Sequence, residues 1–529
     1  MPISRRRLLV SGAAAAAVVG GGAVFTAKRL DTVGLMEEHN EFYTSLPIPK
    51  MLDARALQNR IALTAQAGRA EFLPNFEADT LGYSAPYLGP VIRVYRGDTV
   101  TMTVTNVMDK VTTVHWHGLF VPSELDGGPY GVIDPGQIWQ PSLKIDQPAA
   151  TAWYHPHPHG DTARQVYKGL AGLIYVEDGS SADLGLPGRY GLDDLPLILQ
   201  DRTIGPEGEL IYDDSPMAVM HGSRGDTIVV NGAIGPVAEV PKSIVRLRLL
   251  NGANARNFRL TFDDDRDFHV IANDSGFLAA PVVLTELTIA PGERFEVLVD
   301  FSNGRVTSLL TYPDRNGQYG SSLSDTIKAM VRNVTDIPTP IVRFDPTEDI
   351  SPAVKSLPAR LVELPGVVPS PGATRRAFIL DNMSASNMAM TGETGSMDDM
   401  DHSQMGGMSG MGGTSGLAMG MKMGINGKTF DAARIDVETR LGASEIWELR
   451  STEMAHPFHI HGASFRILSM DGAAPLPHLS GRKDTLLVNE SAEVLVTFDQ
   501  PADPAKPFMF HCHILEHEDA GMMGQYIAV

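Results

Sequence analysis

The only cysteine in the 529-residue chain, Cys512, lies between two histidines close to the C-terminal end. His517 follows it by five positions, and Met522 follows His517 by another five. A lone cysteine forms no disulfide within its own chain, so its chemical value lies in its thiolate. One thiolate, two imidazoles and a weak axial thioether are the ligands of a blue-copper electron-transfer site. Cys512, His517 and Met522 supply three of these four ligands.

The histidines on either side of the cysteine indicate a second metal site. Residues 508–515 have the pattern of a strand, in which successive side chains face opposite sides. His511 and His513 are therefore expected on one face and Cys512 on the other, so electrons could pass along the backbone between two sites. The alternative is a buried, inert cysteine beside hydrogen-bonded histidines, the usual fate of an isolated cysteine or histidine. We reject it because the remaining ligands occur elsewhere in the chain.

Four non-overlapping elements of the form His-x-His occur, two in the first third of the chain and two near its C-terminus. On a strand, such a pair places both imidazoles on one face, where they chelate one metal or reach two adjacent ones. One pair alone is a weak signal, whereas four give eight imidazoles, enough for a three-copper cluster between two domains. His456, which precedes Pro457, completes the blue site. The pairs are His115 and His117, His155 and His157, His459 and His461, and His511 and His513.

Recurring strand patterns indicate the elements that position these residues. Residues 91–107 alternate apolar and polar side chains about a Gly-Asp turn, which predicts a pair of strands. Similar patterns recur in residues 243–262 and 433–449. A second unit, a short turn followed by a strand, occurs three times, in residues 134–145, 290–301 and 489–498. We infer an all-β fold of three consecutive Greek-key β-sandwich domains.

The repeats place the three domains at residues 45–180, 190–345 and 374–529. Residues 338–371 carry eight prolines and fit an extended linker on the surface, which we bound at 346–373. The first and third copies carry histidine pairs at matching places after their opening strands. The middle copy has Asn257 to Leu260 there, so we expect no copper site in it.

The N-terminus and the composition indicate an exported protein. Arg5 and Arg6 precede a weakly apolar Ala- and Gly-rich stretch, so residues 1–30 resemble a cleavable twin-arginine signal rather than a membrane anchor. No other apolar run approaches spanning length, so the mature protein is expected to be soluble, without membrane association, and a monomer. The formal charge of −20 argues against nucleic acid as a partner. We expect a periplasmic or otherwise exported location.

These motifs, in this order and at the two ends of a chain of this size, resemble those of the three-domain multicopper oxidases, the family of laccases, ascorbate oxidase and bacterial cuprous oxidases. The resemblance covers essentially the whole mature chain and implies cupredoxin-like domains with four copper ions. It implies a type 2 copper on His115 and His459, and a type 1 copper on His456, Cys512, His517 and Met522. The implied ligands of the type 3 pair are His117, His155, His157, His461, His511 and His513.

The resemblance also implies the reaction: a reductant gives single electrons to the type 1 copper, and four of them reduce dioxygen to two waters at the three-copper cluster. Water formation needs protons, so carboxylates must lie within reach of the cluster. Asp126 resembles the family's acid near the type 2 copper, and Glu518 resembles its proton-relay glutamate. For either residue alone, the alternative is a turn-forming or solvated carboxylate.

A methionine-rich stretch bears on the substrate. Residues 383–423 hold eleven methionines among Gly, Ser and Asp, a low-complexity composition typical of a mobile insert. Adaptable packing on an apolar patch is the plainer interpretation, but thioethers select Cu(I). Periplasmic cuprous oxidases carry a similar insert, and in them a methionine at the position of Met454, with a nearby aspartate, holds substrate Cu(I). Glu453 is the nearest candidate for that acidic partner here.

Three hypotheses follow. The first is an exported cuprous oxidase that converts toxic Cu(I) to Cu(II) with dioxygen, for copper tolerance. The second is a laccase-like oxidase of phenols or other small organic donors. The third is a copper-binding or storage protein without significant turnover. The complete ligand set disfavours the third, and the methionine-rich insert disfavours the second.

Overall fold

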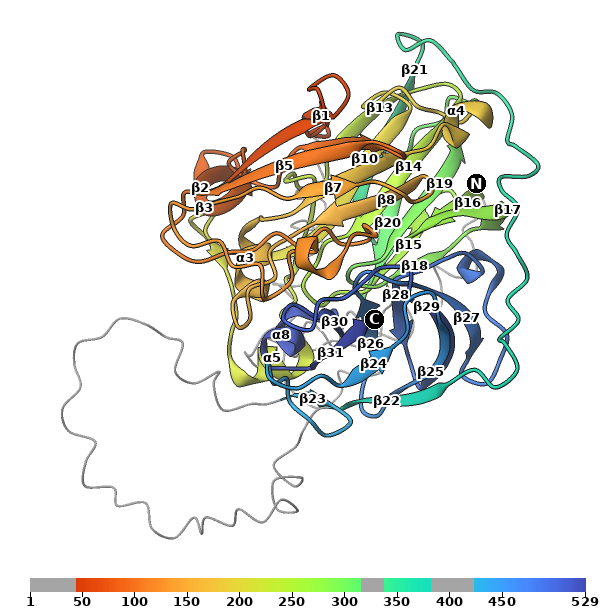
Figure 1. The fold of residues 1–529 in the computed structure, drawn as a ribbon. Coiled ribbons are helices and arrows are strands. Elements are labelled where there is room, and N and C mark those ends of the chain that lie inside the picture. The colour runs from red at the N-terminus through yellow and green to blue at the C-terminus, as the bar shows by residue number, and fades with distance from the viewer. Residues whose placement is uncertain (1–43, 315–336, 382–422) are drawn as a thin grey trace, which may run out of the picture. The chain divides into compact units, whose positions relative to one another are not determined.

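The computed structural model describes residues 44–314, 337–381 and 423–529, and strands dominate it. Within these residues the strands form six sheets, two in each of three consecutive parts of the chain. Figure 1 shows the first part in orange, the middle part in yellow and green, and the third in blue. We refer to the three parts as the first, middle and third sandwich. The all-β class predicted from the sequence is confirmed.

The first sandwich contains the strands β1 (Met51–Asp53), β2 (Arg60–Leu73), β3 (Phe76–Tyr83), β4 (Val91–Tyr95), β5 (Thr99–Asn106), β6 (Ile138–Trp139), β7 (Ser142–Lys144), β8 (Ala150–Tyr154) and β9 (Gly172–Glu177). One sheet has the order β1-β4-β9-β8, and the other has the order β3-β2-β5-β6 with β7 beside β5. Along β5, every second side chain is buried, as its alternating sequence predicts.

The middle sandwich contains the strands β10 (Asp194–Ile204), β11 (Leu210–Ile211), β12 (Thr227–Val230), β13 (Val237–Pro241), β14 (Ile244–Asn251), β15 (Phe258–Phe262), β16 (Phe268–Asn273), β17 (Gly276–Leu284), β18 (Leu287–Ile289), β19 (Arg294–Asp300), β20 (Thr307–Tyr312) and β21 (Thr339–Thr347). Its sheets have the orders β11-β10-β14-β19-β16-β17, with β12 beside β10, and β13-β21-β20-β15-β18.

The third sandwich contains the strands β22 (Arg375–Asp381), β23 (Gly424–Ile425), β24 (Val437–Thr439), β25 (Ser444–Ser451), β26 (His456–Ile460), β27 (Ser464–Met470), β28 (Thr485–Val488), β29 (Ser491–Thr497), β30 (Phe508–Cys512) and β31 (Met523–Ala528). Its sheets have the orders β23-β22-β25-β29-β27 and β24-β31-β30-β26-β28. β30 is therefore an inner strand, paired with β26 and β31.

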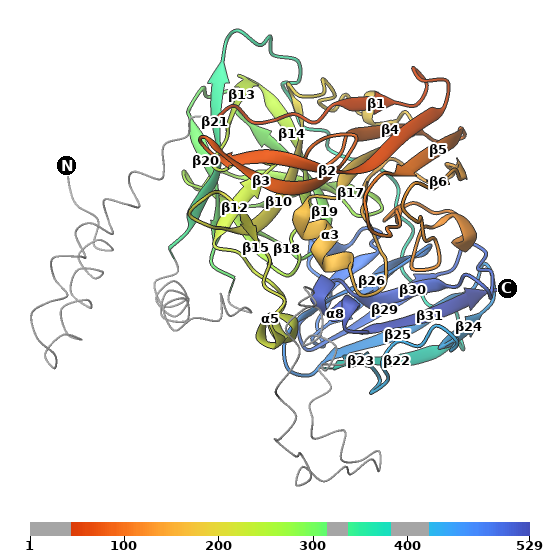
Figure 2. The ribbon, with the colours of Figure 1, turned by 90° about the vertical axis from the view of Figure 1, so that its left-hand side faces the viewer.

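Short helices lie between the strands: α3 (Thr162–Lys168), α4 (Ser180–Asp183), α5 (Pro216–His221) and α8 (Leu515–Asp519), with the 3₁₀ turns η1 (Ser123–Leu125) and η7 (Pro477–Leu479). Ser215 begins α5 by accepting the backbone N–H of Ala218, and Pro216 occupies its first position. α5 lies beside α8 in Figures 1 and 2. Among the described residues, we find no helix of the length and apolarity needed to cross a membrane.

The predicted pairing of the two strands in residues 91–107 is wrong. β4 pairs with β1 and β9, whereas β5 pairs with β2, β6 and β7, so the Gly-Asp turn leads from one sheet to the other. β14 and β15, and β24 and β25, likewise belong to different sheets of their sandwiches. Alternation of side chains identifies a strand but not its partner. The repeated unit is therefore a crossover between sheets.

The proline-rich residues 338–371 are not all linker. β21 occupies their first part and pairs with β13 and β20, and a shift in register near Pro340 accommodates a residue that has no N–H to donate. The chain then runs without strands to β22. On the way, the N–H of Leu361 donates to the carbonyl of Ala279, and Arg466 donates to the carbonyl of Pro365.

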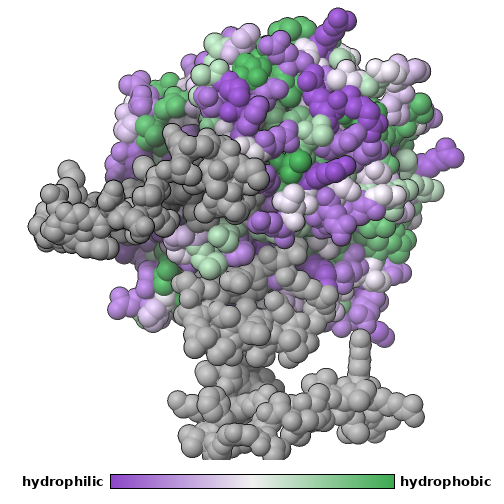
Figure 3. Space-filling model, turned by 90° about the horizontal axis from the view of Figure 1, so that it is seen from below, coloured by the Kyte–Doolittle hydropathy of each residue, from purple (hydrophilic) through white to green (hydrophobic). Residues whose placement is uncertain are grey.

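Buried apolar side chains connect some of the sandwiches more closely than others. One continuous cluster is drawn mainly from the middle and third sandwiches, and the first sandwich has a separate core of its own. On the surface drawn in Figure 3, hydrophilic side chains are mixed with small apolar patches, as on an ordinary solvated surface. The middle and third sandwiches are therefore joined by hydrophobic packing, which fixes the polar contacts between them.

Candidate metal centre

Cys512 and two histidines converge at the end of β30. Sγ of Cys512 lies 3.3 Å from Nδ1 of His456 and 3.7 Å from Nδ1 of His517, and the two nitrogens are 3.3 Å apart. All three residues are buried. His456 begins β26, which pairs with β30, and His517 lies in α8, which starts three residues after Cys512. Three ligand atoms at nearly equal separations can share one metal ion.

The surroundings of these side chains favour a metal over protons. Nε2 of His517 donates to the carbonyl of Met220 at the end of α5, 3.1 Å away, so Nδ1 keeps its lone pair. Burial lowers the pKa of His456 to about 4, and burial together with His456 lowers the pKa of His517 well below its usual range. Both imidazoles are therefore neutral at pH 7. Burial raises the pKa of the Cys512 thiol, so a bound cation is needed to stabilise its thiolate.

Met522 is buried in the turn between α8 and β31. Its carbonyl accepts the N–H of Cys512 at 3.2 Å, and its N–H donates to the carbonyl of His517 at 2.9 Å. The preceding Gly521 has a φ of +98°, and a Cβ there would lie 2.5 Å from Cγ2 of Thr429. Only glycine fits this turn without strain. The turn therefore holds the backbone of Met522 next to Cys512 and His517, the residues beside which the axial ligand is predicted.

The eight histidines of the four His-x-His elements are all buried and form one cluster between the first and third sandwiches. His157, His461 and His511 form a triangle with ring centroids 5.0 to 5.2 Å apart. Nε2 of His511 lies 3.3 Å from Nε2 of His157 and 3.1 Å from Nε2 of His461. The ring nitrogens of this triangle therefore face one another.

A second triangle also combines both sandwiches. The ring centroids of His117, His155 and His513 are 5.1 to 5.6 Å apart. The remaining two histidines, His115 and His459, have centroids 5.8 Å apart. The closest contacts run across these groups, because His115 stacks on His461 and His117 stacks on His459, each with centroids 3.7 Å apart. The eight rings therefore form one connected cluster, within which the two triangles and the pair are the groups that the family resemblance implies.

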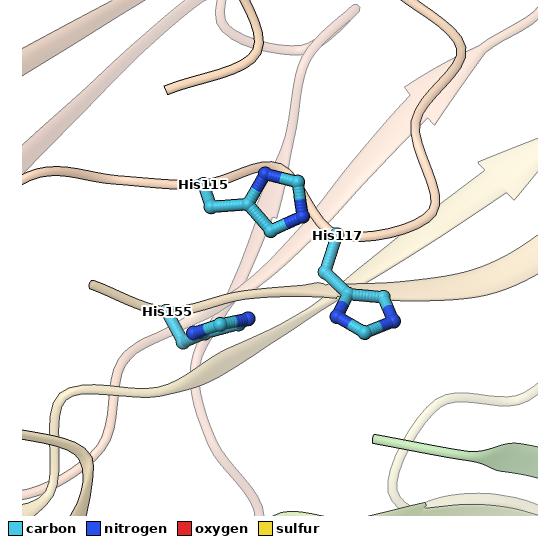
Figure 4. Close-up of side chains that lie close together, drawn as sticks. All are labelled: His115, His117 and His155. Carbon is cyan, nitrogen blue, oxygen red and sulfur yellow. The ribbon is translucent and has the colours of Figure 1, made fainter. Parts of the chain in front are cut away.

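Backbone pairing sets the positions of these rings. His115 and His155 exchange two backbone hydrogen bonds, and His117 follows on the same segment as His115. Figure 4 shows His115 and His117 on one segment and His155 on its neighbour, with the three rings close together. In the third sandwich, β26 and β30 place His459 opposite His511 in the same way. The strand predicted over residues 508–515 is too long, because β30 ends at Cys512 and α8 begins at Leu515. His513 therefore lies beyond the observed strand, yet its ring centroid is 5.7 Å from that of His511.

Most rings in the cluster have one nitrogen bound to an oxygen and the other left free. Nδ1 of His155, His459 and His511 lies 2.9 to 3.0 Å from a backbone carbonyl. Burial, reinforced by neighbouring imidazoles, lowers the pKa of six of these histidines well below the usual range. Buried nitrogens without partners are costly, so this donor set fits metal cations. Among the described residues, the partnerless nitrogens include Nε2 of His115, His155, His459 and His513 and Nδ1 of His117.

The predicted carboxylate Asp126 bridges two sandwiches. Its Oδ2 lies 2.8 Å from Nδ1 of His461 and 3.2 Å from Nδ1 of His115. The next residue, Gly127, has a φ of +78°, and a Cβ there would lie 1.7 Å from the carbonyl oxygen of Val114. The turn after η1 thus requires glycine and directs Asp126 into the cluster.

The second predicted carboxylate, Glu518, is buried against the first triangle. Its Oε1 lies 3.2 Å from Nδ1 of His157, and its Oε2 lies 3.4 Å from Nδ1 of His511. Burial, with the neighbouring Asp519, raises the pKa of Glu518 well above its usual range. Burial also raises the pKa of Asp519 to about 8, although that carboxylate accepts the N–H groups of Thr162 and Ala163 at the start of α3.

Two polar residues at the cluster are missing from the sequence-based set. Oδ1 of Asp484 lies 3.2 Å from Nε2 of His117, and Arg294 of the middle sandwich binds both oxygens of that carboxylate. Burial alone would raise the pKa of Asp484, but Arg294 holds it well below the usual range. No motif points to these residues, because they meet the histidines only through the packing of three sandwiches.

Several methionines and carboxylates lie on the segments next to these ligands. Met454 is partly buried, and Glu453 beside it is exposed. Burial and the charge of Glu453 raise the pKa of Asp381, an acid that the sequence pattern did not identify. On α5, Met217 and Met220 are 45% and 36% exposed. Arg5, Arg6 and residues 383–422 lie outside the described residues.

Comparisons with known proteins agree with this geometry. Three models of the family described as multicopper oxidase match residues 64–181, 203–309 and 397–529. A solved bacterial laccase-like multicopper oxidase, CueO from Ochrobactrum sp., is 46% identical with a TM-score of 0.79, covering 92% of this chain and 100% of that one. A laccase from Pediococcus acidilactici is 33% identical with a TM-score of 0.74, covering 92% and 94%.

Curated relatives carry two different names. The chain is 35% identical over 470 residues to the multicopper oxidase mco of Staphylococcus haemolyticus, covering 88% of this chain and 87% of that one. It is 36% identical over 483 residues to the cell division protein FtsP of Escherichia coli, covering 91% and 92%. With the sandwich fold, the histidine cluster and these matches together, the chain belongs to the multicopper oxidase family.

Proposed function

We propose that this oxidase is exported and oxidises Cu(I), for copper tolerance, coupling four one-electron oxidations to the reduction of dioxygen and four protons to two waters. The observation that carries the proposal is that residues from two ligand sets are neighbours on one segment. Cys512 faces His456 and His517, while His511 and His513 on either side of it belong to the two histidine triangles. One segment thus joins a site for one metal to a site for several.

We assign the family's copper ligands to this geometry. His115 and His459 would hold the type 2 copper, the two triangles the type 3 pair, and Cys512 with His456, His517 and Met522 the type 1 copper. The buried ring nitrogens without partners support a cationic occupant at these places. When bound, the four ions supply one-electron redox chemistry and the site of dioxygen reduction.

Cys512 connects the two sites by covalent and hydrogen bonds. Both His511 and His513 are its neighbours in the backbone, and its carbonyl accepts the Nδ1–H of His511 at 3.0 Å. That hydrogen bond offers a shorter route from Cys512 to the His511 ring than the backbone alone. The residues therefore provide a direct path for electrons.

Glu518 is suited to supply protons. Burial and the neighbouring Asp519 raise its pKa well above the usual range, which favours the protonated form, and its oxygens lie against His157 and His511. A carboxyl that carries a proton in this position can release it toward the site where dioxygen is reduced. Asp126 has a different task, because its Oδ2 orients His461 and His115 through their Nδ1 atoms.

Soft and acidic side chains near the type 1 site support Cu(I) as the substrate. Met454 lies two residues before His456, and the thioethers of Met217 and Met220 are exposed on α5, which contacts His517 through the carbonyl of Met220. Thioethers select Cu(I) over harder ions. The acids Glu453 and Asp381 add negative charge that attracts a cation.

The ends of the methionine-rich insert are also fixed beside this site. Asp381 and Gly424 pair between β22 and β23, so the chain leaves and returns at one place. The N–H of Met423 donates to the carbonyl of Ala520 at 3.1 Å, two residues before Met522. The insert therefore starts next to the turn that carries the proposed axial ligand, which supports a role in delivering Cu(I).

Oxidation of phenols or other organic donors is the second candidate. One comparison favours it: the related Ochrobactrum protein, 46% identical, is described as having oxidase activity towards lignin model compounds. The same type 1 site could accept electrons from an aromatic donor, since the donor only has to reach the histidines that surround Cys512.

We further propose export through a twin-arginine signal in residues 1–30, action as a periplasmic monomer, and domains with the boundaries predicted above. The apolar stretch after Arg5 and Arg6 supports a cleaved signal.

Steady-state kinetics with Cu(I) and with a dimethoxyphenol test the substrate. We expect Met454→Leu, which removes sulfur at nearly constant volume, to lower kcat/KM for Cu(I) by about tenfold, a loss of about 1.4 kcal/mol, and to leave the phenol unaffected. Met108→Leu, in the first sandwich, is the matched control. Turnover of the phenol without turnover of Cu(I) would replace the first candidate by the second, and turnover of neither would indicate a copper-binding protein.

A further inference from the structure

We infer that Asp484, held by Arg294 of the middle sandwich, is a positioning residue that fixes the tautomer of His117. The inference rests on the proposed function in one respect, because it takes His117 to be a metal ligand. The middle sandwich lacks histidine pairs at the corresponding place. By this inference it nevertheless controls the orientation of one ligand of the cluster.

His117 is oriented opposite to its neighbours. In His155, His459 and His511, Nδ1 faces a backbone carbonyl, which leaves Nε2 for a metal. In His117, Nε2 lies 3.2 Å from Oδ1 of Asp484, and Nδ1 has no partner among the described residues. His117 therefore has to bind through Nδ1, and its hydrogen has to be on Nε2, because a neutral imidazole carries one hydrogen and one free lone pair.

Arg294 lies about equally close to the same nitrogen, but its guanidinium favours the opposite tautomer of His117. Its Nη1 is 3.0 Å from Nε2 of His117. A hydrogen bond from the guanidinium to that nitrogen would place the imidazole hydrogen on Nδ1 and remove the lone pair that a metal needs. The carboxylate and the guanidinium thus favour different tautomers of one ring.

The other contacts of Arg294 decide between the two. A guanidinium has five N–H donors, and all five have an oxygen acceptor here. Nε donates to the carbonyl of Thr151, Nη1 donates to the carbonyl of Gly292 and to Oδ1 of Asp484, and Nη2 donates to the carbonyl of Asp274 and to Oδ2 of Asp484. No guanidinium donor remains for His117. Oγ1 of Thr485 lies 3.3 Å from the same nitrogen, but its hydroxyl donates to Oδ1 of Asp484 at 2.8 Å. The Nε2–H of His117 therefore donates to Asp484, its nearest acceptor.

The middle sandwich fixes Asp484 from a second side. Oδ2 of Asp274 accepts the N–H groups of Asp484 and Thr485 at 3.3 and 3.2 Å and lies 2.9 Å from Nζ of Lys483. Asp274 and Arg294, from the β16–β17 turn and the start of β19, therefore hold both the backbone and the carboxylate of Asp484. All of these side chains are buried, so water does not replace the contacts.

The decisive variant is Asp484→Asn. It keeps the shape of the side chain, but its amide can donate to Nε2 of His117, which moves the imidazole hydrogen to Nδ1. We expect ¹⁵N spectra of histidine-labelled, metal-free protein to show Nε2–H for His117 in the wild type and Nδ1–H in Asp484→Asn. The His117 signal is identified by its loss in His117→Gln. Ser275→Ala is the matched control, because Ser275 contacts Asp484 at Oδ2, the oxygen that does not contact His117.

Copper binding gives a second measurement. Residues that orient metal-bound histidines typically change affinity by about 10–100-fold, so Asp484→Asn should weaken cluster copper by that factor in competition with a chelator. The type 1 absorption should persist.

Two results would overturn the inference. One is a wild-type His117 that carries its hydrogen on Nδ1, and the other is unchanged copper affinity in Asp484→Asn. If the wild type shows Nε2–H but binds no copper at the cluster, the proposed function fails and the tautomer assignment stands.

Discussion

At the scale of single residues, most imidazoles of the cluster have one ring nitrogen beside an oxygen, which leaves the other nitrogen for a metal. Carbonyls occupy Nδ1 of His155 and His459, Asp126 contacts Nδ1 of His461, and Asp484 contacts Nε2 of His117. These contacts lie within the protein, so folding itself orients the rings and meets part of the cost of positioning the ligands.

Cys512→Ser is the most direct test at this scale. A hydroxyl replaces the thiolate, so we expect the variant to lose the intense blue absorption and the oxidase activity. One buried atom contributes little to three sandwich cores, so the free energy of unfolding should fall by no more than about 1–3 kcal/mol. Visible absorption, oxygen consumption and denaturant unfolding check these outcomes. A variant that remained blue and active would contradict the assignment of Cys512.

Spacing alone could predict the histidines of the site but not the residues that orient them. His-x-His pairs and the segment around Cys512 are local patterns with few other uses, and the structure brings all of them together. Asp484 and Arg294 are separated by many positions in the chain and meet only when the middle and third sandwiches pack. Nothing in the residues near either one marks that meeting.

At the scale of elements, strands were predictable and their partners were not. Alternating side chains identify β4 and β5, but the sheet to which each belongs depends on which apolar face packs on which. The prolines of residues 338–371 obscured β21, because proline is a poor strand residue away from edges and irregular pairings. Those that the structure places in β21 lie next to a register shift or in a parallel pairing with β13.

We expect the contact that the 3₁₀ turn η7 makes between the third and middle sandwiches to depend on pH. His478 in this turn packs near Phe295, with ring centroids 6.3 Å apart, and Asn273 donates to its carbonyl. Burial, together with Lys483, lowers the pKa of His478 from 6.5 to about 4. Between these values the unfolded chain binds the proton and the native protein does not, so stability falls as pH drops from 6.5 to 4.

His478→Gln should remove this dependence. We expect the wild type to lose about 2 kcal/mol more than the variant between pH 6.5 and 4, less than the full shift in pKa implies because His478 is partly exposed. Urea unfolding of metal-free protein at both pH values measures the difference. Parallel losses in the two proteins would show that His478 does not contribute.

At the scale of the whole molecule, the same fold supports relatives with different names, so function depends on the residues of the site. The chain is about as similar to the cell division protein FtsP, at 36% identity, as to the multicopper oxidase mco, at 35%. In this chain, the features that point to an oxidase are the eight clustered histidines and the neighbouring Cys512, not the three sandwiches alone.

The proposed location depends on the first residues of the chain. Changing Arg5 and Arg6 together to Lys keeps the positive charge but removes the pair that a twin-arginine translocase reads. We expect the variant to remain in the cytoplasm, as measured by fractionation and immunoblotting, while the wild type reaches the periplasm. Equal periplasmic amounts of the two proteins would exclude this export route.

The choice between substrates depends on the methionine-rich insert and on the site next to which it begins. Met423 at its end is buried beside the turn that leads to Met522, and Asp381 at its start is paired with Gly424. Because the two ends meet, residues 390–422 can be removed without stretching the strands that flank them. Small soft ions pass a methionine-lined cover more readily than bulky aromatics do.

Deleting residues 390–422 should therefore move the two activities in opposite directions. We expect kcat/KM for Cu(I) to fall at limiting copper, because thioethers that capture the ion are lost. We expect the rate with a bulky phenol to rise, because the approach to His456 and Cys512 becomes more open. Replacing the same residues by a Gly-Ser linker of equal length separates the loss of methionines from the change in length. If both rates stayed at the wild-type value in the deletion and in the linker variant, the insert would have no part in substrate choice, and the case for Cu(I) would rest on Met454 and the methionines of α5.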